Sequence, residues 1–135
     1  MTVIYPKSGK FLKEYAINLS KQKLNNLSLI VVKDKYSQDL DIFKKNLNGI
    51  TCDFIHSNSS PLVNRINGLK HCYKKKFDLV ICSDIDDLFC PNAIASIKNF
   101  FIKNTQEKIA YSNLIYKKKK KKFFFKKKKK KFFLK

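Results

Sequence analysis

Short apolar runs alternate along this chain with segments in which apolar residues recur at helical spacing. Four runs have the length and composition of β-strands: Thr2–Pro6, Leu27–Val32, Ile50–Ile55 and Phe77–Cys82. A helical pattern follows each of them, in Phe11–Leu24, Asp39–Leu47, Leu62–Tyr73 and Pro91–Lys103. A fifth strand is expected to start within Lys108–Tyr116. This alternation predicts an α/β fold with a mostly parallel, open, Rossmann-like sheet and helices on both faces.

The third helical segment has a clear start signal. Ser60 and Pro61 precede it, and proline is favoured at the first position of a helix. The helical pattern then places Leu62, Ile66, Leu69 and Tyr73 on one face of the segment.

Ligands of an open parallel sheet bind beyond the carboxyl ends of its strands. Three segments occupy such positions here: Pro6–Gly9, Lys33–Ser37 and Ser83–Asp87. The last segment is the most informative, because Asp84, Asp86 and Asp87 are three of the ten acidic residues of the chain.

Clustered carboxylates repel one another, and a bound cation offsets that repulsion. Strand alternation is expected to send Asp84 and Asp86 to the same side, where they can share one metal ion. Mg²⁺ and Mn²⁺ prefer carboxylate oxygens together with phosphate oxygens of a substrate. The alternatives are a solvated acidic loop, or a helix N-cap provided by Asp87.

The net charge of +20 is concentrated in one segment. Residues 117–135 contain only 13 Lys, five Phe and one Leu, which leaves 17 basic and 10 acidic residues in residues 1–116. The sequence thus divides into an α/β domain, 1–116, and a low-complexity tail, 117–135, and the domain gives no reason to expect a specific nucleic-acid partner.

The tail has no helical or strand period, so we expect it to be disordered or irregular. Three interpretations stay open. The segment is a degenerate or artefactual C-terminus, in which case the chain is truncated, or a basic anchor that makes peripheral contact with an anionic membrane. The third interpretation is that the segment is ordered structure.

Cysteine usage and hydropathy bear on the compartment. Cys52, Cys72, Cys82 and Cys90 form no C-x-x-C pair, and neither His56 nor His71 lies at zinc-finger spacing from them. No apolar run approaches the roughly 20 residues of a membrane helix. We expect a cytoplasmic protein, either free or at the inner face of the membrane.

The segment FDLVICSDIDDLFCPN, residues 77–92, resembles the donor-site region of family 2 glycosyltransferases, which have the GT-A fold. That family delivers a D-x-D motif from an apolar strand. Upstream, Thr2–Pro6 resembles the first strand, Leu29–Ser37 the second strand with its VVDDGS ending, and Leu62–Leu69 the RNxG stretch; together the likeness covers about residues 2–115.

The chain departs from the family pattern in two places. Lys33 replaces the first Asp of DDGS, so that only Asp34 matches, and Tyr36 stands beside Ser37 where the family has glycine. In the helix motif Arg65 matches, but Asn67 and Gly68 are out of step.

The resemblance implies a metal-dependent glycosyltransferase that uses a nucleoside-diphosphate sugar, with a UDP-sugar preferred, and a glycan or lipid acceptor. It assigns Asp84 and Asp86 to Mn²⁺ or Mg²⁺, and Asp84 also to the sugar nucleotide. Asp34 would accept from the nucleobase or ribose, Arg65 would contact a base edge or phosphate, and Pro6 would place backbone near the nucleobase. In proteins of this family the catalytic base lies in the C-terminal half, which should begin where the lysine tail starts in this chain. The base is therefore unknown here.

Two other classes stay open. Residues 84–89 also resemble the first motif of haloacid-dehalogenase-type phosphatases, in which Asp84 would be the nucleophile and Asp86 the acid/base. The other class is a non-enzymatic basic module that binds a membrane or polyanion through the tail.

Overall fold

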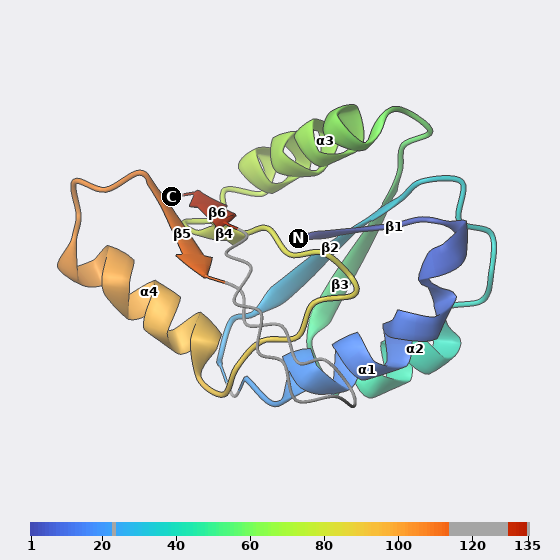
Figure 1. Cartoon of the computed structure of the whole chain (residues 1–135), viewed down its shortest axis with the longest axis horizontal. Coiled ribbons are helices and arrows are strands. Elements are labelled where there is room, and N and C mark those ends of the chain that lie inside the picture. Colours follow the sequence, from blue (N-terminus) through green and yellow to red (C-terminus); the bar gives the residue numbers. More distant parts are fainter. Residues whose placement is uncertain (23, 114–129, 135) are drawn as a thin grey trace, which may run out of the picture.

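The computed structural model describes residues 1–22, 24–113 and 130–134. Three of the predicted strands form a parallel sheet in the order β1 (Thr2–Ile4), β2 (Ser28–Lys33) and β3 (Thr51–His56), as Figure 1 shows. The central strand β2 is buried on both faces along Leu29–Val32, which explains its uninterrupted apolar sequence.

The fourth predicted strand is shorter than expected. Regular pairing is confined to β4 (Val80–Ile81), which lies in a second sheet of order β4-β6-β5, with β5 at Ile109–Asn113 and β6 at Lys130–Leu134. Both β4 and β5 pair with β6 in antiparallel orientation.

Met1 connects the two sheets. Its ammonium group donates to the carbonyl of Ile81 over 2.7 Å, and the backbone N–H of Ser83 donates to the carbonyl of Met1 over 3.1 Å. This is the hydrogen-bond pattern of one parallel ladder step between Met1 and Cys82. The end of the fourth strand therefore lies beside β1, parallel to it, and the strands follow the order β3-β2-β1-β4-β6-β5.

Helices cover both faces of the parallel sheet, as predicted. Figure 1 shows α1 (Gly9–Ser20) and α2 (Asp41–Asn46) on one side and α3 (Pro61–Lys74) on the other. A short 3-10 turn, η1 (Pro6–Ser8), leads from β1 into α1, and α4 (Ala93–Lys103) follows the fourth strand. The main core lies between the sheet and the α1–α2 layer and includes Ile4, Leu12, Tyr15, Val31 and Phe43.

Helix α3 begins as its sequence predicts, but packs through an unexpected face. The Ser60 hydroxyl accepts from the Val63 N–H, and Pro61 is the first helical residue. The buried positions are Asn64, Gly68 and Cys72, not the apolar stripe that begins at Leu62. A Cβ at Gly68 would lie only 2.8 Å from the Val32 side chain, so the missing side chain lets the helix approach the sheet closely.

Most of the lysine-rich tail lies outside the described residues. The expectation that the tail is disordered or irregular stays a prediction for that part. Its last described segment, Lys130–Leu134, is the strand β6 and has backbone partners on both sides. The irregularity expected of the tail does not extend to these five residues. Among the described residues, no helix is long and apolar enough to span a membrane.

Candidate functional site

A turn of four residues, Asp84–Asp87, follows the strand end beside β1 and is called the acidic turn below. The backbone N–H of Asp87 donates to the carbonyl of Asp84 over 3.1 Å, which closes the turn. Carboxylate oxygens of Asp84, Asp86 and Asp87 lie within 4.8 Å of one another. The carboxylates of Asp84 and Asp86 lie close together, as expected. The turn brings them together, whereas the expectation rested on strand alternation. Asp87 is not a helix cap, since Asn92 is the N-cap of α4.

Residues on either side of Asp84 anchor the acidic turn in the core. Ile85 is buried and packs in the main core, while the Ser83 hydroxyl lies 2.6 Å from the Tyr15 hydroxyl of α1. Burial raises the pKa of Tyr15 to about 12, so the phenol is neutral at physiological pH. With Ser83 and Ile85 turned toward α1, Asp84 is left on the α3 side of the sheet.

Two amide side chains, from Asn18 in α1 and from Gln22 two residues beyond its end, hold the segment after the turn. Asn18 accepts from the Phe89 N–H over 2.7 Å and donates to the Phe89 carbonyl over 3.0 Å. Gln22 donates to the Cys90 carbonyl over 3.2 Å and accepts from the Ile94 N–H over 3.3 Å. The sequence analysis missed these residues; their one signal is that the two amides stand four residues apart within the predicted helical segment Phe11–Leu24.

Arg65 is brought to the acidic turn from α3. Its guanidinium Nη2 donates to Asp84 Oδ1 in an ion pair, with both side chains about half exposed. The structure therefore places two of the predicted site residues in direct contact. The pair partly neutralises the turn, and Asp84 and Asp86 both remain exposed to solvent.

Asp34 lies at the same edge of the sheet, directly after β2. Its backbone N–H donates to the Ile4 carbonyl over 2.8 Å, which extends the β1–β2 ladder. Its Oδ1 is buried and has no hydrogen-bond partner among the described residues. A buried carboxylate oxygen without a donor is costly, so this atom is suited to accept from a ligand.

Pro6 begins η1, where the chain leaves β1 between Asp34 and the acidic turn. Asp34 and Asp84 are separated by β1, which sets their backbones two interstrand spacings apart, about 10 Å.

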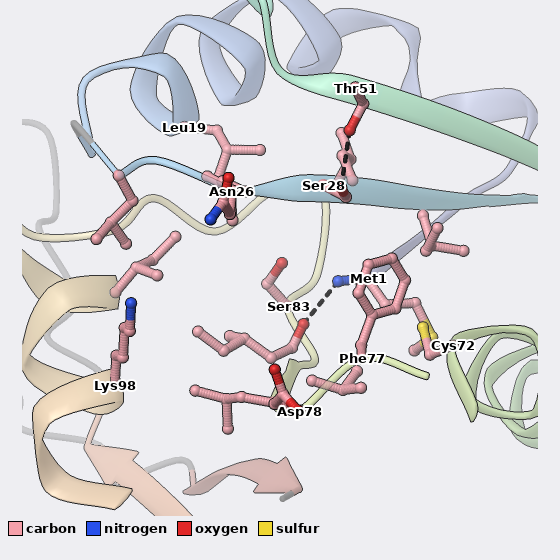
Figure 2. Close-up of a pocket in the computed structure, with 18 of the residues that line it drawn as sticks. Met1, Leu19, Asn26, Ser28, Thr51, Cys72, Phe77, Asp78, Ser83 and Lys98 are labelled. Atoms are coloured by element: carbon pink, nitrogen blue, oxygen red, sulfur yellow. Dashed lines mark hydrogen bonds between the residues drawn. The ribbon is translucent and has the colours of Figure 1, made fainter. Parts of the chain in front are cut away.

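A large cavity lies elsewhere in the described part of the chain. It has a volume of about 1090 Å³ and lies between the start of β2, residues 76–81 and α4, as Figure 2 shows. Its described lining is mainly apolar, with Leu19, Phe77 and Phe101 among its members, and it includes none of Pro6, Asp34, Arg65, Asp84 and Asp86. We therefore build the candidate site on the acidic turn at the carboxyl edge.

A solved structure shares this arrangement of elements. The structure of TarS from S. aureus, a glycosyltransferase, matches 84% of this chain with a TM-score of 0.65 and 20% sequence identity. The chain therefore shares the fold of the matched part of TarS. It spans one fifth of the length of TarS, because the match covers 20% of that chain. Neither a protein-family model nor a curated protein matches the sequence.

Proposed function

We propose that this chain is the donor-binding part of a metal-dependent glycosyltransferase of the family 2 type, which takes its sugar from a nucleoside diphosphate sugar, preferably a UDP-sugar. The observation that carries the proposal is the convergence of three carboxylates, within 4.8 Å, at the carboxyl edge of a glycosyltransferase-like sheet. A cytoplasmic location and a glycan or lipid acceptor are parts of the same proposal.

The acidic turn fits Mn²⁺ or Mg²⁺ by the chemistry of its donors. Both ions take hard oxygen ligands and retain positions for substrate phosphate oxygens. Asp84 and Asp86 would hold the ion, since both are exposed and their carboxylates adjoin. When bound, the ion supplies Lewis-acid stabilisation of the departing diphosphate.

The other site residues are placed to bind the nucleoside and phosphates. Asp34 Oδ1 would accept a hydrogen bond from the nucleobase or ribose, which gives the buried oxygen the donor that it lacks. Arg65 can exchange part of its contact with Asp84 for a phosphate oxygen, because a guanidinium offers several donors at once. Pro6 would set the backbone beneath the nucleoside between these two groups.

Isothermal calorimetry with UDP and GDP, with and without Mn²⁺, tests the proposal. We expect UDP binding that depends on Mn²⁺. Asp86→Asn should abolish the increase in UDP affinity that Mn²⁺ causes. Asp34→Asn should weaken UDP binding, but this weaker binding should still depend on Mn²⁺. Asp41→Asn, on the exposed start of α2, is the matched control and should bind like wild type.

Two results would reject the proposal. One is a folded sample that binds neither nucleotide in either condition. The other is hydrolysis of a simple phosphate ester that is lost in Asp84→Asn, which would replace the transferase with the phosphatase alternative.

A further inference from the structure

The outer face of α3 carries an unpartnered apolar stripe, formed by Leu62, Ile66, Leu69 and Tyr73. The exposed fractions are 68% for Leu62, 40% for Ile66 and 85% for Tyr73, and Leu69 is half-buried. At about 100° per residue, the four positions fall within roughly 60° of the helix circumference. Such a stripe in a sheet-covering helix ordinarily faces the core.

The sheet cannot bury this stripe, because α3 packs through its opposite side. Asn64, Gly68 and Cys72 occupy the contact with β1 and β2, and Gly68 fixes how closely the helix approaches. Asn64 is fully buried and hydrogen-bonds to both backbone groups of Ser59. Rotation of α3 to bury the stripe would break these bonds, so the exposure of the stripe is built into the packing.

Two lysines lie along one side of the stripe on the same helix. Lys70 and Lys74 are exposed and, within the described part of the chain, form no ion pair. The α3 sequence, Pro61–Lys74, contains no acidic residue. Asp53, the carboxylate that pairs with His71 and Lys75, lies on β3 at the inner side of the helix.

An apolar stripe bordered along one side by lysines, on a helix without acidic residues, is complementary to an anionic lipid surface. We propose that the outer face of α3 lies on the surface of a bilayer that contains anionic phospholipid. Leu62, Ile66 and Tyr73 enter the headgroup region, while Lys70 and Lys74 contact lipid phosphates. The contact is independent of the proposed sugar-nucleotide site and distinct from any contact made by the tail.

A single tryptophan reports the contact directly, because the natural chain contains none. Tyr73→Trp and Leu62→Trp place the probe in the stripe of the full-length chain. Ile42→Trp, on α2 at the other face of the sheet and 66% exposed, is the matched control. Each variant is mixed with vesicles of phosphatidylcholine and phosphatidylglycerol, with or without brominated acyl chains, and with phosphatidylcholine alone.

We expect the emission of both stripe variants to shift to shorter wavelength and to be quenched by the brominated lipid, only when phosphatidylglycerol is present. The Ile42→Trp emission should not change. Lys70→Gln and Lys74→Gln in the Tyr73→Trp chain should each weaken vesicle binding roughly fivefold, the factor that corresponds to about 1 kcal/mol per lysine. Lys13→Gln and Lys45→Gln are the charge controls and should preserve the quenching.

Four results overturn the proposal. The chain does not bind the anionic vesicles, or it binds them with unchanged emission from both stripe variants, which assigns the contact to the tail. Quenching is equal in Ile42→Trp, which indicates adsorption without orientation. The shift appears without vesicles as protein concentration rises, which indicates that a second copy covers the stripe.

Discussion

Asn18 is predicted to stabilise the fold through the segment that follows the acidic turn. Its side chain hydrogen-bonds to the N–H and to the carbonyl of Phe89, at 2.7 and 3.0 Å, across 71 residues of sequence. Asn18→Ala removes both of these partly buried bonds at once. The variant creates no steric conflict, because alanine is smaller than asparagine and is a better helix former.

The size of the effect follows from these contacts. Two hydrogen bonds contribute about 1 kcal/mol each to the free energy of unfolding, and the higher helix propensity of alanine returns about 0.6 kcal/mol. The expected net loss is about 1.5 kcal/mol. For a chain of this size, that loss lowers the melting temperature by roughly 5 °C.

Urea and thermal unfolding followed by circular dichroism measure this difference. Asn46→Ala is the matched control, because the Asn46 amide donates only to the Ile42 carbonyl within its own exposed helix. We expect the control to unfold within about 0.5 kcal/mol of wild type. The reasoning fails if Asn18→Ala is as stable as Asn46→Ala.

Three further predictions concern other parts of the molecule. Burial raises the pKa of Tyr15 from 10.0 to about 12, so above pH 10 the unfolded chain releases this proton while the folded chain keeps it. The stability advantage of wild type over Tyr15→Phe should therefore be constant below pH 10 and shrink by up to about 3 kcal/mol toward pH 12. A constant difference in the free energy of unfolding across this range would contradict the burial. Of the four thiols, exposed Cys90 should react with a disulfide reagent roughly tenfold or more faster than Cys52, whose pKa burial raises to about 11, and equal rates in the folded chain would oppose this. Termination of the chain after Lys129 removes β6 and its pairing with β4 and β5, so the melting temperature should fall measurably, whereas an unchanged value would show that β6 adds nothing to the stability.

The sequence by itself determined the element types and their order. A short continuous apolar run such as Leu29–Val32 is typical of a strand that is buried on both faces of the sheet. Ser60-Pro61 indicates a helix start through local backbone chemistry alone. The carboxyl-edge positions of Asp34 and Asp84 followed from the same reasoning, because in a parallel sheet the end of each strand fixes the edge on which the next residues lie.

Tertiary structure decided which surfaces met. The periodicity of α3 marks Leu62 and Tyr73 as one face, but only the close approach at Gly68 determines that this face is exposed. The hydrogen bonds from Tyr15 to Ser83 and from Asn18 to Phe89 join positions 68 and 71 residues apart. The contact of Arg65 with Asp84 joins two elements that are 19 residues apart. Local propensity carries no information about such pairs, because each depends on where the whole chain places two elements, and the geometry of the acidic turn rests on them.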